Sequence, residues 1–223
     1  MRTSCFRLTS FLTLLGFAAS VHAQSPAAPT DLFNGKDLAG WSLVNSKNAD
    51  IATVCHVTDD GVMAVAGKPI GYLLAAGTYS NYKLHVEWRW PANAVRNSNS
   101  GILIHIASGP VDRNTWPVCF QVQTKLNRGG DILPMAHATF AEPLSTAPGA
   151  ANPQINRQNP SSEKPLGEWN VCEVVCRDGA LDCTLNGVVQ NHVTGCQPAA
   201  GQIGIQLEGL PYELRHIRIE PLP

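Results

Sequence analysis

The sequence has 223 residues and a formal net charge of −1 at pH 7, with no strongly basic run. This near-neutral balance argues against nucleic acid or an anionic membrane surface as the partner. The length is sufficient for one domain with a complete hydrophobic core.

Residues 1–23 have the three parts of a secretory signal peptide. Arg2 and Arg7 form a positive start, residues 11–19 are apolar, and residues 21–23 fit a cleavage site. The apolar run is too short to span a bilayer, so we expect an exported protein, periplasmic or secreted, with no membrane segment. Removal of residues 1–23 changes the formal charge from −1 to −3. We interpret residues 24–30 as a Pro/Ala linker and residues 31–223 as one domain.

The domain contains many short strand patterns separated by turn signals, and no amphipathic helix pattern. Asp59-Asp60-Gly61 predicts a hairpin between two short strands, and Asp178-Gly179 and Asn186-Gly187 predict two further tight turns. The other strands are predicted at residues 72–74, 82–90, 103–106, 118–125, 188–193, 202–208 and 212–219. This pattern predicts an all-β sandwich of two antiparallel sheets.

Residues 82–125 carry the clearest alternation of apolar and polar side chains. Strict alternation places one face of a strand on a core and the other toward solvent or a ligand. Consecutive strands usually pair, so we expect the outward positions of these strands to share one face. Those positions are Glu87, Arg89, His105, Gln121 and Gln123. Amides, a guanidinium, an imidazole and a carboxylate are suited to binding hydroxyl groups, which makes this face the candidate site.

Residues 127–168 show no sustained period and contain several prolines and glycines. A loop of this length in a compact domain is usually functional or disordered. We expect it to be mobile and to border the polar face, where Asp131 and His137 could enter the site. A turn role for Asp131 is the main alternative.

Six cysteines remain after residue 23, an even number that predicts disulfides in an exported chain. A two-residue turn at Asp178-Gly179 places Cys172, Cys176 and Cys183 on one face with no two directly opposed. Diagonal neighbours lie about 7–8 Å apart, beyond the usual Cα separation of about 4.4–6.8 Å for a disulfide. A Cys172–Cys183 bridge would therefore need a shifted register.

In the last predicted strand, the apolar positions change parity after Leu214, which predicts a β-bulge.

Several segments of the domain resemble the 3-keto-disaccharide hydrolase domain family. They are residues 32–41 (LFNGKDLAGW), 99–102 (NSGI), 167–170 (GEWN), 185–187 (LNG) and 201–206 (GQIGIQ). The resemblance extends over residues 31–222. It implies a concanavalin A-like jelly-roll sandwich whose concave sheet binds glycans, and a disulfide between Cys176 and Cys196. Members of that family commonly have Glu where this chain has Gln121, and an amide is not a general acid or base near neutral pH.

Two kinds of chemistry remain open for a glycosidase of this family. A pair of carboxyl groups can flank the scissile bond, and Glu87 and Glu208 are the first candidates for that pair. Alternatively, a 3-keto group acidifies the neighbouring C–H, so that one base, such as His105, is sufficient. The alternative for Glu87 and for His105 is a structural role, which is the usual role of a lone His on a strand.

The expected sugar-binding residues are Arg89, Gln121, Gln123, Lys125, Asp131 and Gln206. No cofactor is expected, and no metal, because no Asp-rich ligand spacing occurs. We expect the tryptophans Trp88 and Trp90 in the core, and Trp116 and Trp169 as stacking candidates.

The expected function is cleavage of 3-keto-disaccharides or related 3-keto-glycosides. The first alternative is a noncatalytic carbohydrate-binding domain, which Gln121 favours. The second is a structural or partner-binding envelope domain, which the lack of repeats and exposed apolar runs disfavours.

Overall fold

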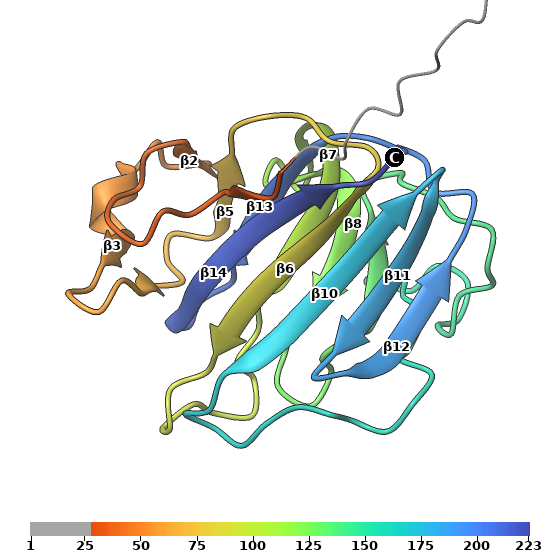
Figure 1. Ribbon diagram of the computed structural model, residues 1–223. Helices are drawn as coiled ribbons and strands as arrows, with labels where there is room; N and C mark the ends of the chain where they lie inside the picture. Colours follow the sequence, from red (N-terminus) through yellow and green to blue (C-terminus); the bar gives the residue numbers. More distant parts are fainter. Residues whose placement is uncertain (1–27) are drawn as a thin grey trace, which may run out of the picture.

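A computed structural model describes residues 28–223, which form a sandwich of two antiparallel β-sheets (Figure 1). This confirms the predicted all-β class. The strands are β1 (Thr30–Asp31), β2 (Trp41–Asn45), β3 (Cys55–Val57), β4 (Met63–Val65), β5 (Gly71–Ala75), β6 (Tyr82–Arg89), β7 (Gly101–Asp112), β8 (Trp116–Gln123), β9 (Ile132–Met135), β10 (Asn170–Arg177), β11 (Ala180–Leu185), β12 (Val188–Val193), β13 (Gln202–Leu207) and β14 (Tyr212–Pro221). The one helix among these residues is a 3-10 turn, η1 (Ile51–Thr53). Within the same residues, no helix is long and apolar enough to cross a membrane.

The two sheets differ in composition and in position. The eight-stranded sheet has the order β12-β11-β10-β6-β14-β4-β3, with β1 added beside β14, and it faces the viewer in Figure 1. The six-stranded sheet has the order β2-β5-β13-β7-β8-β9 and lies behind it. β1 begins at Thr30, one residue before the predicted start of the domain.

The core between the sheets follows directly from the alternation of the sequence. Along β6, buried and half-exposed residues alternate without exception, and Leu84, Val86 and Trp88 are buried between the sheets. From the other sheet, Phe120 and Val122 enter the same core, as do the alternate residues of β13. Their neighbours Gln121 and Gln123 consequently face outward from the six-stranded sheet.

The chain changes sheets between β6 and β7. β6 pairs with β10 and β14, whereas β7 pairs with β8 and β13. The expectation that consecutive strands of residues 82–125 share one face is therefore wrong for β6. The outward side chains of β6 and those of β8 lie on opposite outer surfaces of the sandwich.

The predicted bulge in the last strand is confirmed. The pairing of β14 with β6 shifts between Arg215 and Arg218, and His216 has a positive φ of 48°. The extra residue restores the inward direction, so that Leu214 and Ile217 are both buried in the core.

The β10–β11 hairpin has the predicted register, with Cys176 opposite Leu181, Val174 opposite Cys183 and Cys172 opposite Leu185. All six cysteines of the described chain are buried free thiols, so the expected Cys176–Cys196 bridge is not formed in this structure. Burial raises the pKa of the Cys176 thiol to about 12. A buried, protonated thiol reacts slowly.

Residues 127–168 are only partly irregular. They contain β9, which pairs with β8 and extends the six-stranded sheet, so the expectation of a loop without strands is wrong at this point. Pro134 weakened the strand signal, but β9 is an edge strand, where proline is tolerated. Ile155 bridges to β9 at Ile132, and residues 158–162 run along β11 and β12. The contribution of this segment to the site is described below.

The central position of β6 makes its core residues sensitive to truncation. We predict that Leu84→Ala, at a fully buried side chain, lowers the free energy of unfolding by about 2–5 kcal/mol. Urea denaturation should report this loss with an unchanged m-value. The control Leu166→Ala, at a side chain that is 36% exposed, should change stability by no more than about 0.5 kcal/mol. Equal losses in the two variants would contradict the assignment of the core.

Candidate functional site

A pocket of about 470 Å³ lies on the outer face of the six-stranded sheet. Small-molecule sites typically have volumes of about 300–1,000 Å³. Its floor comes from β8, β9 and β13, and its walls come from the tip of the β7–β8 hairpin and from residues 133–138 and 144–154. The long segment therefore borders the polar face, as the sequence predicted. Its mobility stays a prediction.

Three glutamines form a hydrogen-bonded row in the floor. The Gln121 amide donates to the Gln123 side-chain oxygen at 3.0 Å and to the Gln206 side-chain oxygen at 3.1 Å. All three side chains are largely buried, so their polar groups need partners. Gln121 uses both of its amide hydrogens in the row, and the Gln123 oxygen also accepts from the backbone N–H of Lys125 at 3.1 Å. Within residues 28–223 the NH2 groups of Gln123 and Gln206 have no protein acceptor, and they can donate to a ligand.

The row depends on a glycine in the neighbouring strand. Gly101 lies opposite Gln123 on the outer face. A Cβ atom at Gly101 would lie 2.5 Å from Cγ and 2.7 Å from Nε2 of Gln121. Because Gly101 has no side chain, it leaves the space that Gln121 needs to reach Gln206.

Glu208 lies at the end of the row, directly after β13. Asn99 donates a hydrogen bond of 2.7 Å to its carboxylate. Burial raises the pKa of Glu208, although Lys125, Arg113 and the Asn99 hydrogen bond act in the opposite direction. A carboxylate with a raised pKa in a pocket is suited to accept a proton.

Five of the predicted site residues therefore lie together in this pocket. They are Gln121, Gln123, Lys125, Gln206 and Glu208. Trp116, expected as a stacking residue, also lines the pocket, on the side away from Gln123.

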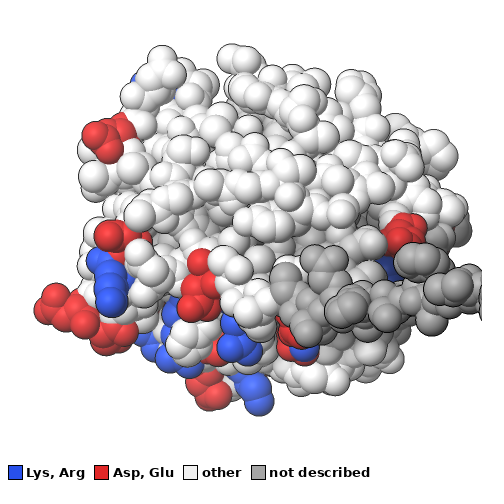
Figure 2. Space-filling view, turned by 45° about the horizontal axis from the view of Figure 1, so that its top comes forward, with Lys and Arg blue, Asp and Glu red and all other residues white. Residues whose placement is uncertain are grey.

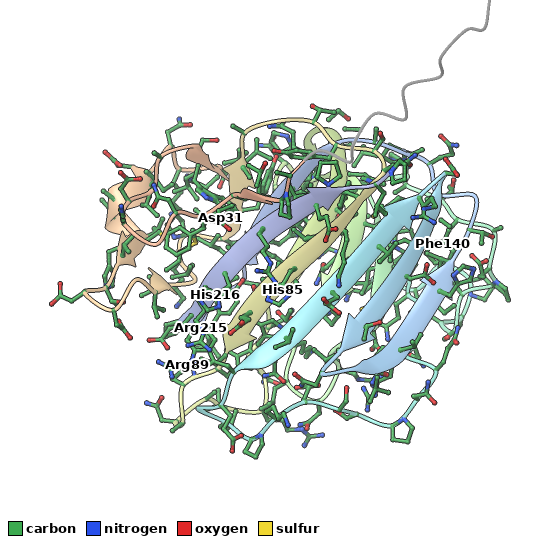
Figure 3. The ribbon with its side chains drawn as sticks, viewed as in Figure 1. Asp31, His85, Arg89, Phe140, Arg215 and His216 are labelled. Carbon is green, nitrogen blue, oxygen red and sulfur yellow. The ribbon has the colours of Figure 1, made fainter. Side chains whose placement is uncertain are left out.

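Glu87 and Arg89 are not part of this pocket, and their expected place on its face is wrong. They point outward from the eight-stranded sheet, because β6 belongs to that sheet. Glu87 accepts hydrogen bonds from Arg215 at 2.7 Å and His216 at 2.9 Å, and Arg89 pairs with Glu213. Figure 3 shows Arg89, Arg215 and His216 together at one end of β6 and β14.

These ion pairs have the character of a structural surface network. Burial raises the pKa of Glu87, but the bonds from His216 and Arg215 outweigh it and hold the pKa below its usual value. The ring of Trp169 contacts two guanidinium groups, at 4.4 Å from that of Arg89 and 4.2 Å from that of Arg215. Trp169 is therefore stacked on the outer sheet, far from the pocket floor. Figure 2 shows acidic and basic side chains interspersed in a band along one side of the molecule.

His105 lies in the interior, and its expected place on the polar face is wrong. The β7–β8 register shifts after Ile104, and His105 has a φ of 55°, which turns its side chain inward. Its ring contacts Tyr82 and Phe120 edge-on and shares a 3.2 Å hydrogen bond with the Pro198 carbonyl. Burial lowers the pKa of His105, which favours the neutral ring.

Asp131 has a structural role, although its side chain binds a distant part of the loop and does not make the local turn contacts of the alternative interpretation. Its side chain is 1% exposed, accepts a hydrogen bond from the backbone N–H of Arg157 at 2.8 Å, and lies 3.7 Å from Arg128. It fixes the loop beside the pocket and does not line the pocket itself. His137 does line it and is exposed.

The sequence did not identify three contributors to the site. Asn99 stands just before β7 in a segment noted only for its family resemblance, although its position before a strand that borders the row was a usable signal. Arg113 lies at the tip of a hairpin whose length the sequence did not predict. Met135 belongs to β9, in a segment where the sequence predicts no strand.

The pocket contains one carboxylate against the amide row. Among the described acidic residues, only Glu208 and Asp112 line it, and Asp112 lies at the hairpin tip, where it pairs with Arg113. The expected pair of Glu87 and Glu208 is excluded because the two lie on opposite sheets. The arrangement can bind hydroxyl or carbonyl oxygens through amide and ammonium hydrogens, and it can accept one proton on Glu208.

Solved structures share this fold at low sequence identity. A proposed glycosyl hydrolase from Parabacteroides distasonis has a TM-score of 0.62 at 19% identity, covering 87% of this chain and 94% of that chain. The carbohydrate-binding module CBM66 from Bacillus subtilis has a TM-score of 0.56 at 9% identity, covering 81% and 95%. LamAcat from Zobellia galactanivorans has a TM-score of 0.55 at 12% identity, covering 88% and 97%.

Among curated proteins, none matches this sequence. The sequence does match the family described as "3-keto-alpha-glucoside-1,2-lyase-like domain" over residues 28–220, which is nearly the whole described chain. Since the match, the jelly-roll sandwich and the resembling segments coincide, the chain belongs to the 3-keto-disaccharide hydrolase, or 3-keto-α-glucoside-1,2-lyase-like, domain family.

Proposed function

We propose that this protein cleaves the glycosidic bond of 3-keto-glycosides, including 3-keto-disaccharides, in the pocket of the six-stranded sheet. The observation that carries the proposal is a single half-buried carboxylate, Glu208, beside a row of buried amides. One base with nearby hydrogen-bond donors suits an elimination. It does not suit a mechanism that needs two flanking carboxyl groups.

The elimination proceeds from the acidity of the C–H group next to the ketone. Glu208 removes the proton at C2, the electron pair forms the C1=C2 bond, and the C1–O bond breaks. The leaving oxygen takes a proton from water or a neighbouring acid. Addition of water to the unsaturated ketone then gives the free 3-keto sugar, so that the net reaction is hydrolysis.

Hydrogen-bond donors stabilise the negative charge that develops on the ketone oxygen. The NH2 groups of Gln123 and Gln206 and the ammonium of Lys125 line the pocket near Glu208. The amides are fixed by the hydrogen bonds of Gln121, so they need little rearrangement when the charge develops. The family description, with its 1,2-lyase chemistry, supports the same reaction.

A noncatalytic carbohydrate-binding role is the second candidate. The observation that favours it is the amide at position 121, where members of this family commonly have a carboxylate. A row of three glutamines binds hydroxyl groups without any need for a base. A module with this sandwich fold, CBM66, is a carbohydrate-binding protein by name.

We also propose export, from the signal-like residues 1–23, and a Cys176–Cys196 bridge in the exported protein. Export exposes the chain to an oxidising compartment, where disulfides persist. Peptide mapping without reduction, on protein isolated from the cell envelope or medium, tests both. A Cys176 peptide linked to another partner would contradict the bridge, and a retained N-terminus would contradict cleavage of the signal.

Glu208→Gln should lower turnover of a 3-keto-disaccharide by about 10²–10⁴-fold, the usual contribution of a general base. It should not lower stability at neutral pH, because the raised pKa means that folding disfavours the charged form. Steady-state kinetics and thermal unfolding measure the two effects.

The matched control is Glu87→Gln on the opposite sheet. Glu87 has a lowered pKa, so its stabilising effect is present above its unfolded-state pKa and is lost as pH falls through its folded-state pKa. The variant should lose about 1–3 kcal/mol of stability near neutral pH and retain turnover. Loss of turnover in this variant, or normal turnover in Glu208→Gln, would refute the assignment.

The pH dependence of turnover should follow the ionisation of Glu208. Since the base must be deprotonated, kcat/KM should fall as pH falls through a pKa above the ordinary value of 4.5. Asn99→Ala removes a hydrogen bond that lowers this pKa. The acid limb of the pH profile should therefore move to higher pH. An unmoved limb would show that Glu208 is not the group whose ionisation causes the acid limb.

Gly101→Ala should displace Gln121 from the row. Because the new Cβ would meet a side chain and not backbone, the stability cost should stay within about 1–3 kcal/mol. Sugar binding, measured by calorimetry, should weaken as much as in Gln121→Ala. The double variant should be no worse than either single variant, since both act through the same amide. Additive losses would show that Gly101 acts by another route.

A further inference from the structure

A second cavity adjoins the pocket on the far side of Arg128. Its volume is about 290 Å³, and the side chain of Arg128 lines both cavities. Its other lining residues are Asp131 and residues 156–160, which are polar apart from Pro160. The elimination at Glu208 does not use this second cavity.

Backbone pairing places the second cavity on the face that carries the amide row. The Gln123 N–H donates to the Asp131 carbonyl at 2.9 Å, and Ile132 and Ile155 exchange two backbone hydrogen bonds. Ile132 and Ile155 both pack in the core, so their neighbours Asp131 and Asn156 lie opposite each other on the outer face. Adjacent strands are about 4.8 Å apart, which places Asn156 two strand spacings, about 10 Å, from Gln123.

The buried carboxylate of Asp131 holds this lining in place. It accepts a hydrogen bond from the backbone N–H of Arg157 at 2.8 Å and one from the Gln154 amide at 3.3 Å, and Arg128 lies 3.7 Å from it. The Gln154 amide also donates to the Asn156 side-chain oxygen at 2.6 Å. These contacts fix the direction of the Asn156 amide and occupy the carboxylate of Asp131.

Other polar groups of the second cavity are free to bind a ligand. Within residues 28–223, the NH2 group of Asn156 and the side-chain amide of Gln158 make no hydrogen bond, and both residues are exposed. Arg157 uses one guanidinium nitrogen, which donates to the Asn127 carbonyl. Amide and guanidinium hydrogens bind hydroxyl oxygens, and the amide oxygen of Gln158 can accept from a hydroxyl. Because Arg128 faces the Asp131 carboxylate, this lining suits a neutral polyol better than an anion.

We propose that the second cavity binds a further sugar of an oligosaccharide whose 3-keto sugar lies at the amide row. The place of the 3-keto sugar rests on the proposed function. The pocket holds the two sugars that flank the scissile bond, and the chain continues past Arg128 to Asn156 and Gln158. The preferred substrates are therefore 3-keto-oligosaccharides longer than a disaccharide.

Calorimetric titration of the Glu208→Gln protein, which should not consume its ligands, tests the proposal. The probes are glucose di-, tri- and tetrasaccharides with a 3-keto sugar at the non-reducing end, in an α-1,4-linked and an α-1,6-linked series. In one of the two series, we expect the affinity to rise about tenfold once the chain is long enough to reach the second cavity, the gain from a few net hydrogen bonds. Equal affinities along both series, or binding of none of the probes, would overturn the proposal.

Two exposed glutamines supply matched variants. Gln158→Ala should lower the affinity for the tetrasaccharide about two- to tenfold and leave that for the disaccharide unchanged. Gln197→Ala should change neither, because Gln197 is exposed and lines neither cavity. Equal effects of Gln158→Ala on both probes would contradict a contact beyond the disaccharide. Displacement of the tetrasaccharide, but not of the disaccharide, by inorganic sulfate would identify an anion site instead and would also overturn the proposal.

Turnover by the wild-type protein separates this proposal from the proposed function. A rise of affinity with chain length, without cleavage of any probe, would refute the lyase reaction and leave the second sugar site standing. Cleavage of all probes with no dependence of affinity on chain length would refute the second sugar site alone.

Discussion

The pocket depends on how the Gln121 amide is satisfied. A buried amide that lacks a partner costs about 1–3 kcal/mol, and Gln121 has two hydrogens to place. Gln123 and Gln206 accept them from opposite sides, and Gly101 leaves the necessary space. This one arrangement fixes two further amides, directs their NH2 groups to the ligand space, and joins β8 to β13 across β7. Glu208 follows directly from the end of β13, so the proposed base is positioned by the same strand that completes the row.

The two outer faces of the sandwich contain similar residue types in different settings. On the eight-stranded sheet, carboxylates and cations neutralise one another in pairs, and Glu87 has a lowered pKa for that reason. On the six-stranded sheet, Glu208 accepts a side-chain hydrogen bond from the neutral Asn99, and burial raises its pKa despite the charges of Lys125 and Arg113. The difference between the two pKa values arises from burial and from the number of direct cationic partners. Neither can be predicted from the periodicity of a single strand. Part of the segment 127–168 lines the pocket, and part of it hydrogen-bonds β11 and β12 of the eight-stranded sheet.

The sequence predicted the properties that depend on local periodicity. The alternation of β6, β8 and β13, the register of the β10–β11 hairpin and the parity change in β14 are all present in the structure. It failed where a side chain's direction depends on distant pairing. Glu87 and Arg89 alternate correctly, but the chain changes sheets after Trp90, which reverses the surface to which they belong. The predicted direction of His105 is wrong for a local reason. The strand has a bulge there with a positive φ, and no neighbouring residue type predicts it. Of the site, the glutamine row and Glu208 were predictable because they lie on regular strands, whereas Asn99, Arg113 and Met135 depend on the hairpin and edge strand that the sequence did not define.

The amide at position 121 has a consequence for the base. A carboxylate there would face the two side-chain oxygens that now accept from Gln121, and both glutamines would have to turn their NH2 groups toward it. Each of those groups would then have only one hydrogen left for a ligand. A second negative charge in the same pocket would also raise the pKa of Glu208 further, since like charges oppose ionisation. With Gln121, the row donates outward and Glu208 has no second carboxylate in the floor beside it. Gln121 therefore leaves Glu208 as the one carboxylate beside the amide row, which is the arrangement that the proposed single-base elimination requires.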